Sequence, residues 1–369
     1  MNSRGCWNTE TQKHENTKTM KNTQTAFHRL LDILKRGDQS FLSKDMDAQS
    51  QVDGYRHMAH LLAYAMDFYL NSDPLRPEFT AFSSPEQKFL GDNVGSIYYF
   101  APLQPDQTYR IRGRRFNSCY LSFAIYGGKP DGSTSERVVD TINHRRIEFE
   151  DDGRFEILLT PDEPQGPNQF QLTPDSVTLF SREYFYDPAT MQEAELEIEN
   201  ANPPAAPGPV TDEELARRFE AVANFVEQTL MFIPLPFPLP ENGFTPPFPF
   251  PKDQRSWGLT DNIYCFGRFK LAEDEYLRIH FQSPECVYWG IQTWNFFMQS
   301  MDYRYHRVMI NNGLATPNED GSYTVIVSRR PTDAPNSLTT AGYEEGMVFC
   351  RWLLAEDMPE QPVMEVGTW

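Results

Sequence analysis

The feature that most constrains this chain is an internal repeat, in which residues 92–182 resemble residues 261–352. Identical residues lie 168 positions apart through most of both stretches (271 − 103 = 168) and 169 apart near their ends (261 − 92 = 169). Two β-rich halves with similar turns would share some matches by chance, but the near-constant offset favours a duplicated unit. The matching pairs include Leu103 with Leu271, Arg110 with Arg278, Tyr120 with Tyr288, Gly153 with Gly321, Asn168 with Asn336, Asp92 with Asp261 and Arg182 with Arg351.

Both copies consist of short runs rich in aromatic and β-branched residues, such as IYYFAPL, TYRIRGR and CYLSFAIYG in the first. Such runs are typical of β-strands, and Asp-Gly pairs between them are typical of turns. Short strands without long helices between them favour antiparallel sandwiches or jelly rolls. The predicted fold is therefore mainly β with N-terminal helices: two related antiparallel β-sandwich or jelly-roll-like units, at residues 76–199 and 253–369.

The N-terminal part divides into two predicted segments. Residues 1–23 are polar and have almost no apolar side chains to bury, which predicts a disordered leader. Residues 24–75 carry apolar residues at helical spacing, which predicts a helical segment. One helix is expected to stop at Gly37 and a longer one near Pro74, since glycine and proline commonly end helices.

Residues 200–252 are predicted to join the two units. The Pro/Ala-rich run NANPPAAPGPV indicates a linker, and a capping box at Thr211 predicts the start of a helix. A Pro/Phe-rich strap, FIPLPFPLPENGFTPPFPFP, follows; its prolines exclude a helix or a central strand. Three roles are open for the strap: a packed element across the β-domain, a wall or lid of an apolar pocket, or an oligomer contact.

The net charge of −19 disfavours nucleic-acid binding and an anionic membrane surface as partners. No apolar run reaches the length of a membrane helix and no N-terminal secretion signal is apparent. The five cysteines are scattered without a C-x-x-C pair, which favours free thiols in a reducing compartment. We therefore expect a cytoplasmic protein.

Several motifs resemble an uncharacterised, mainly bacterial family, the domain of unknown function 1214. They include GYRHMAHLLAYAMDFY, YRIRGRR, SREYFYD, YWGIQTWNFFMQSMDYRYHRVMINN, DGSYTVIVSRR and TTAGYEEG, and the resemblance spans residues 54–354. The resemblance implies a β-rich protein with jelly-roll-like sandwiches and implies no particular activity. Where the family tends to read GDNPD this chain reads GDNVG, and where it tends to read NWLDTAGH this chain reads NSLTTAGY. Ser337 and Tyr343 thus replace the family's Trp and His, which puts any activity that depends on that His in doubt.

No metal or cofactor is predicted. His57 and His60 lie three residues apart on a predicted helix face, but no third ligand is apparent. The sequence also lacks the G-x-S-x-G elbow of a serine hydrolase.

Acidic, arginine and aromatic residues form the predicted site. Arginine in an acidic protein pairs with carboxylates or binds an anionic group, and aromatic residues on one strand face can line a pocket. The predicted catalytic residues are Asp92, Asp261, Tyr343 and Arg351. The predicted ligand-binding residues are Asn93, Arg110, Asn262, Tyr288, Trp289, Gln292, Trp294, Asn295 and Asn336.

Two functions are compatible with this pattern. The first is a hydrolase or lyase that acts on an apolar or lipid-like small molecule in an aromatic pocket between the repeats. The second is a non-catalytic protein that binds an apolar or amphipathic ligand or assembles into a homo-oligomer.

Overall fold

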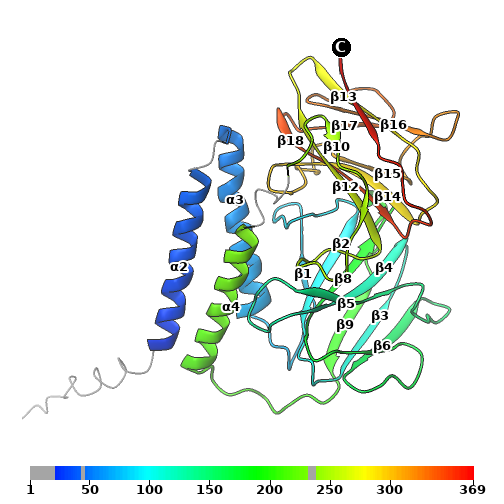
Figure 1. The fold of residues 1–369 in the computed structure, drawn as a ribbon. Coiled ribbons are helices and arrows are strands. Elements are labelled where there is room, and N and C mark those ends of the chain that lie inside the picture. Colours follow the sequence, from blue (N-terminus) through cyan, green and yellow to red (C-terminus); the bar gives the residue numbers. More distant parts are fainter. Residues whose placement is uncertain (1–20, 43–45, 232–237) are drawn as a thin grey trace, which may run out of the picture.

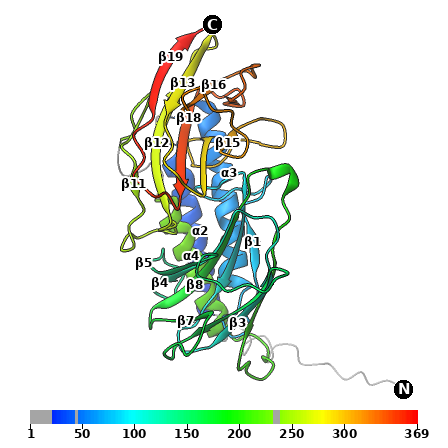
Figure 2. The same cartoon turned by 90° about the vertical axis from the view of Figure 1, so that its right-hand side faces the viewer.

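The structure is a computed structural model that describes residues 21–42, 46–231 and 238–369. Residues 1–20 of the predicted leader and 232–237 of the predicted strap lie outside the described residues. The described residues form three long helices beside two β-sandwiches (Figure 1), and the second sandwich, with the C-terminus, lies above the first (Figure 2). The prediction of a mainly β fold with N-terminal helices and two related units is confirmed.

The helices are α2 (Lys21–Leu42), α3 (Ala48–Ala65), which continues into the π-helical turn η1 (Met66–Leu70), and α4 (Asp212–Leu230). The side chain of Thr211 caps α4 by accepting a hydrogen bond from the backbone N–H of Glu214 at 3.2 Å. This is half of the predicted capping box, because the Glu214 carboxylate binds two arginines of the same helix instead.

The prediction that the first helix stops at Gly37 is wrong. Helix α2 continues to Leu42, and it begins at Lys21, inside the predicted leader. A Cβ atom at Gly37 would lie 3.0 Å from the sulfur of Met58 on α3 and 3.1 Å from Cδ1 of Leu230 on α4. The glycine therefore allows three helices to approach closely rather than ending one of them.

The first sandwich contains two sheets. The strand order of one is β1-β2-β8-β4-β5 and of the other β7-β6-β3-β9. A short 3₁₀ turn, η2 (Pro188–Thr190), precedes β9. The strands are β1 (Thr80–Phe82), β2 (Ser96–Pro102), β3 (Tyr109–Arg114), β4 (Tyr120–Gly127), β5 (Arg137–Asn143), β6 (Arg154–Thr160), β7 (Gln169–Gln171), β8 (Ser176–Tyr184) and β9 (Glu195–Asn200).

The second sandwich repeats this arrangement. One sheet has the order β10-β12-β18-β14-β15, with β11 also pairing with β12, and the other has the order β17-β16-β13-β19. The strands are β10 (Gly243–Phe244), β11 (Phe248–Pro249), β12 (Asn262–Lys270), β13 (Glu275–Phe281), β14 (Tyr288–Trp294), β15 (Met309–Asn311), β16 (Tyr323–Ser328), β17 (Ser337–Thr339), β18 (Glu345–Leu353) and β19 (Val363–Thr368).

The predicted duplication is confirmed by strand order and register. The orders β2-β8-β4-β5 and β7-β6-β3-β9 recur as β12-β18-β14-β15 and β17-β16-β13-β19. A parallel pairing in each sandwich also recurs at the same offset. Leu158 lies opposite Gln169 in the first, and Ile326 opposite Ser337 in the second (326 − 158 = 168).

The register corrects one predicted pair. Strand β2 contains IYYF and β12 contains IYCF, and these stretches align with an offset of 166 residues (264 − 98 = 166). The first tyrosine of each, Tyr98 or Tyr264, lies opposite an arginine of the neighbouring strand, β8 or β18. Asp261 therefore corresponds to Gly95 and not to Asp92.

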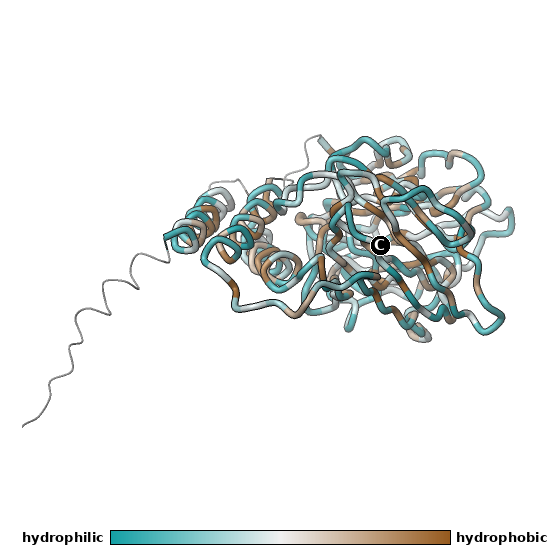
Figure 3. Tube along the Cα trace, turned by 90° about the horizontal axis from the view of Figure 1, so that it is seen from below, coloured by the Kyte–Doolittle hydropathy of each residue, from teal (hydrophilic) through white to brown (hydrophobic). Residues whose placement is uncertain are grey.

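The helices cover the outer face of the β1-β2-β8-β4-β5 sheet and lie to one side of the β body (Figure 3). Phe68 of η1 stacks on Phe100 of β2 with ring centroids 4.2 Å apart, and Phe225 of α4 packs against Phe68 at 5.9 Å. Strands β4 and β8 are buried on both faces, because one face meets the opposing sheet and the other meets the helices.

Equivalent asparagines tie the two sandwiches together. Asn143 Nδ2 at the end of β5 donates to Asp261 Oδ2 of the second repeat at 2.7 Å. Asn311 Nδ2 at the end of β15 donates to the backbone carbonyl of Tyr186 in the first repeat at 2.9 Å. The two asparagines are equivalent in the repeat (311 − 143 = 168), but one donates to a side-chain carboxylate and the other to a backbone carbonyl.

Candidate ligand-binding site

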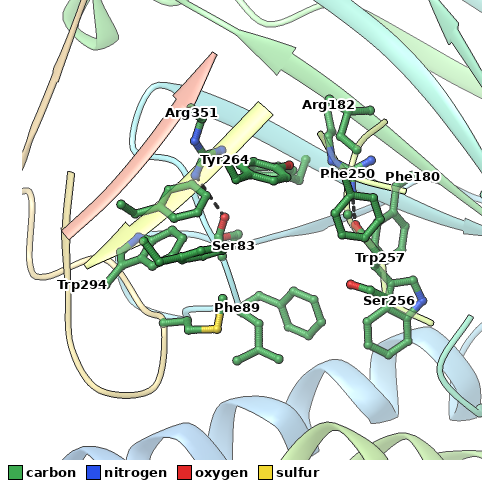
Figure 4. A pocket seen from close by; sticks show the side chains of 18 of the residues that line it. Ser83, Phe89, Phe180, Arg182, Phe250, Ser256, Trp257, Tyr264, Trp294 and Arg351 are labelled. Atoms are coloured by element: carbon green, nitrogen blue, oxygen red, sulfur yellow. Dashed lines mark hydrogen bonds between the residues drawn. The ribbon is translucent and has the colours of Figure 1, made fainter. Parts of the chain in front are cut away.

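A cavity of about 230 Å³ lies where the two repeats meet. Side chains of β2 and β8 from the first repeat and of β12 and β18 from the second line it, together with residues 82–83, 89–91, 254 and 256–259. In the close-up, the strands lie above the cavity and the helices below it (Figure 4). The cavity is therefore framed by elements from both copies.

Arg182 of β8 lines the cavity although only 6% of it is exposed. Its Nη2 donates to the backbone carbonyl of Trp257 at 2.7 Å, while Nη1 has no hydrogen-bond partner among the described residues. The guanidinium lies over the rings of Phe180 and Tyr126, at 5.4 and 5.8 Å from their centroids. Its described contacts are thus neutral, and a charged group with an unused donor is left in an apolar place.

Arg351 of β18 lines the same cavity and is 3% exposed. Its two Nη atoms donate to the Tyr184 hydroxyl and to the Gly91 carbonyl, each at 3.3 Å. Its guanidinium lies 4.7 Å from the centroid of the Phe349 ring. These partners are also neutral, and no ion pair joins Arg351 to a carboxylate in the described part of the chain.

Two tyrosines of the lining, Tyr98 and Tyr264, do not neutralise these two charges. Burial raises the pKa of Tyr98 and raises that of Tyr264 to about 12, so both phenols are protonated at neutral pH. The amide of Asn262 donates to the Tyr264 hydroxyl at 2.9 Å and to the Tyr184 hydroxyl at 3.3 Å. Asn262, a predicted ligand-binding residue, therefore orients two tyrosines of the lining from behind.

Aromatic rings form the ends of the cavity. At one end, Phe349 stacks on Trp294 with centroids 4.1 Å apart. At the other end, Phe180 lies 6.5 Å from Trp257. Figure 4 shows Trp294 on the side of Arg351 and Trp257 on the side of Arg182. Each arginine is therefore flanked by an aromatic wall.

The strap contributes to this wall. Phe248 and Phe250 line the cavity, and β11 pairs with β12. A Cβ atom at residue 258 would lie 2.2 Å from the Phe250 ring, so Gly258 is needed for the strap to pack there. Of the three roles considered for the strap, its described part fills two, as a packed element and as a pocket wall.

Asp92 was predicted to be catalytic, but its carboxylate does not line the cavity. It accepts hydrogen bonds from the Ser300 backbone N–H at 2.7 Å and from the Ser300 hydroxyl, and Lys88 Nζ lies 3.9 Å away. Burial raises the pKa of Asp92, and Lys88 and Ser300 oppose this shift. Its backbone carbonyl accepts from Trp294 Nε1 at 3.1 Å, so Asp92 holds the cavity wall in place.

Asp261 and Tyr343, also predicted to be catalytic, lie elsewhere. Asp261 Oδ2 accepts from the Tyr120 hydroxyl at 2.8 Å at the contact between the sandwiches. The Tyr343 hydroxyl donates to the carboxylate of Asp53 on α3 at 3.2 Å. The four predicted catalytic residues therefore do not converge, and only Arg351 among them lines the cavity.

Of the predicted ligand-binding residues, Trp294 lines the cavity and several others form a buried layer behind it. Asn93 Nδ2 lies 3.3 Å from the Tyr288 hydroxyl, and Gln292 Nε2 donates to the Asp92 carbonyl. These contacts join the loop before β2 to strand β14 and thereby position the wall.

The remaining predicted residues have structural contacts away from the cavity. Trp289 packs in the core of the second sandwich. Asn295 Oδ1 accepts from backbone N–H groups of its own loop, and Asn336 Nδ2 donates to the Thr316 carbonyl at 2.7 Å. Arg110 pairs with Glu199 at 3.2 Å on the surface. The prediction that these four bind the ligand has no support from their positions.

Most of the residues that line the cavity were not predicted from the sequence. Arg182 appears in the repeat as the partner of Arg351, but it was not included in the predicted site. The signal available was the pairing of IYYF with IYCF and of Arg182 with Arg351, which places Tyr98 and Tyr264 beside equivalent arginines. Trp257 lies outside both repeated stretches, so the repeat gives no signal for it.

The histidine pair of α3 has local partners. His57 is fully buried, its Nδ1 lies 3.1 Å from Gln299 Nε2, and burial lowers its pKa to about 3. His60 Nδ1 accepts from the Lys88 backbone N–H at 3.1 Å. Across residues 21–42, 46–231 and 238–369, no three His, Cys, Asp or Glu side chains gather as metal ligands would.

Comparison with known proteins identifies a similar fold but no function. The chain superposes on the crystal structure of an uncharacterized protein from Burkholderia cenocepacia with a TM-score of 0.83 and 29% identity, covering 93% of this chain and 96% of that one. A protein from Vibrio parahaemolyticus gives a TM-score of 0.50 at 12% identity, covering 85% and 98%. The first likeness supports the whole architecture, and the second concerns the fold alone.

No family model and no curated protein matches the chain, so the resemblance to the domain of unknown function 1214 stays a prediction. None of the helices in the described ranges combines the length and apolarity needed to cross a membrane.

Proposed function

We propose that this protein binds a small amphipathic anion in the cavity between its two repeats, without catalysing a reaction. The observation that carries the proposal is the pair of buried arginines, Arg182 and Arg351, whose described partners are all neutral. An anionic group on the ligand would supply the missing partner, and the aromatic walls would hold its apolar body.

Energetics support this assignment. Burying a charge without a counter-charge costs several kcal/mol in a protein. A position that carries such a cost commonly has a functional use, because the sequence could otherwise place an apolar residue there. The cost falls when an anion enters, since a charge-assisted hydrogen bond to a carboxylate is about twice as strong as a neutral one.

Binding is better supported than the hydrolase or lyase hypothesis. The described residues that line the cavity include serines and tyrosines but no Asp, Glu, His, Lys or Cys, so a serine there has none of the usual general bases beside it in the lining. The four described cysteines are free thiols, which supports our further proposal of a reducing, cytoplasmic location.

Calorimetric titration with octanoate and 4-phenylbutyrate, each compared with its neutral primary amide, tests the proposal. We expect the acids to bind and to raise the melting temperature, and the amides to bind at least about ten-fold more weakly. Arg182→Met should weaken acid binding by about ten-fold or more, because one charge-assisted contact is lost. Arg110→Met, which removes an arginine from a surface ion pair, serves as the matched control and should bind normally.

The stability of the unliganded variant separates function from structure. Arg182→Met should melt within a few degrees of the wild type, or above it, because it removes a buried donor that has no partner. Equal binding of acid and amide, or normal acid binding by Arg182→Met, would contradict the proposal.

A further inference from the structure

We infer that the ligand is a dicarboxylate, with an anionic group at each end of an apolar body. This inference rests on the proposed function and specifies its ligand class. It follows from the equivalence of the two arginines, since each repeat contributes one to the same cavity.

The charge of the lining requires two negative groups. Arg182 and Arg351 are the only charged residues among the described residues of the lining, which therefore carries two positive charges. A monoanion would neutralise one guanidinium and leave the other buried without a counter-charge. A ligand with two carboxylates would neutralise both.

Nearby carboxylates are already engaged. The Asp92 carboxylate receives two hydrogen bonds from Ser300 and lies 3.9 Å from Lys88, so it already has a cationic partner. Asp261 receives hydrogen bonds from the Tyr120 hydroxyl and the Asn143 amide. Neither forms an ion pair with a cavity arginine, although the charge of Arg351 opposes at longer range the rise that burial causes in the pKa of Asp92. Within the described residues, a direct counter-charge is therefore lacking for both arginines, and a ligand would supply it.

The positions of the arginines favour two separate anionic groups over one shared group. Arg351 and Arg182 lie toward opposite sides of the close-up, and Tyr264 lies between them (Figure 4). Each guanidinium has its own aromatic neighbour, Phe349 for Arg351 and Phe180 for Arg182. The lining thus offers two similar charged ends with an apolar middle, which matches an α,ω-dicarboxylate.

The test is calorimetric titration of the full chain with α,ω-dicarboxylates of four to ten carbons, each paired with its monomethyl ester. We expect one chain length to bind best and to exceed its own ester by at least about ten-fold, the loss expected for one charge-assisted contact. In Arg182→Met the diacid and its ester should bind with the same affinity, because only one anionic group then has a partner. Arg351→Met should behave in the same way at the other end.

The outcomes separate the inference from the proposed function. If the monoester binds wild-type protein as tightly as the diacid, the dicarboxylate inference is wrong while anion binding stands. If an alkyl phosphate of matched length binds more tightly than every diacid, a single dianionic group bridges the arginines and the inference is equally wrong. If no diacid, ester or phosphate binds, the proposed function itself fails. Should Arg351→Met not fold, Arg182→Met alone decides the comparison.

Discussion

The two repeats share their strand order but use it differently. Tyr98 of β2 lies opposite Arg182 of β8, and Tyr264 of β12 lies opposite Arg351 of β18. Both pairs line the same cavity. The arginines differ in their partners. Arg351 donates to two neutral oxygens, whereas Arg182 donates to one and keeps Nη1 without a partner among the described residues. Duplication thus doubled a charged position, and divergence left an unused donor on the arginine of the first copy among the described residues.

The copies also differ where they contact each other. Asp261, before β12, accepts hydrogen bonds from Tyr120 and Asn143 of the first repeat. The equivalent position before β2 is Gly95, where an added Cβ would lie 3.1 Å from the Phe185 carbonyl. One copy therefore uses a carboxylate at the contact and the other uses close backbone packing.

The largest expected effect tests whether the repeats fold as one unit. Ile111 and Ile279 are equivalent, fully buried core residues of β3 and β13. Ile111→Ala and Ile279→Ala should each lower the free energy of unfolding by about 2–5 kcal/mol. Both should shift one common transition, because the helices, the first sandwich and residues of the second share one hydrophobic cluster.

Urea denaturation followed by tryptophan fluorescence and circular dichroism measures this effect, with the exposed Val363→Ala as control. Val363 is 54% exposed, so its replacement should change stability by no more than about 0.5 kcal/mol. If unfolding showed two transitions and each core variant shifted only one of them, the repeats would unfold independently.

The architecture was predictable because it rests on patterns that repeat along the chain. Strand alternation, Asp-Gly turns and the offset of 168 residues (271 − 103 = 168) are local or periodic signals. The helix end predicted at Gly37 was wrong because the role of this glycine depends on Met58 and Leu230, which lie on other helices. A glycine at a helix crossing and a glycine at a helix end look alike in one sequence.

The site was less predictable, because a sequence does not distinguish a catalytic aspartate at the start of a repeat from one that stabilises a loop. Asp92 and Asp261 both hold loops, through contacts more than a hundred residues away. Arg351 was found and Arg182 was not, although the repeat paired them. The decisive fact is that both point into one cavity, and this depends on how the sandwiches pack.

A second prediction concerns Glu183, which the first repeat has where the second has Trp352. Glu183 is 1% exposed, and burial raises its pKa to about 7 from the usual 4.5. Between pH 4.5 and about pH 7 the folded state binds more protons at Glu183 than the unfolded state does. The contribution of this group therefore makes the free energy of unfolding fall as the pH rises through this range. Glu183→Gln removes this loss and should stabilise the protein by roughly 3 kcal/mol at pH 8 and little at pH 4.

The measurement is the free energy of unfolding of wild type and Glu183→Gln at each pH. Buried His57, whose pKa burial lowers to about 3, gives the opposite slope below pH 6.5 and cancels in the difference between the two proteins. The exposed Glu360→Gln serves as control. A difference that does not grow between pH 5 and pH 8 would contradict a buried, protonated Glu183.

The smallest expected effect compares surface charges of the two copies. In the first, Glu199 pairs with Arg110 at 3.2 Å and with Arg112 at 3.0 Å, and both arginines also contact Glu156. In the second, Arg278 has a single pair with Glu365 at 3.0 Å.

These side chains are largely exposed, so Glu199→Gln should cost only about 0.5–1 kcal/mol and Glu365→Gln less than about 0.5 kcal/mol. Chemical denaturation in urea at low salt measures the difference. In 1 M NaCl it should vanish, because the screening length falls to about 3 Å. Equal costs for the two variants would mean that the four charges of the first repeat act as separate pairs. A cost that persists at high salt would mean that the carboxylate of Glu199 contributes through packing or hydrogen bonding rather than through charge.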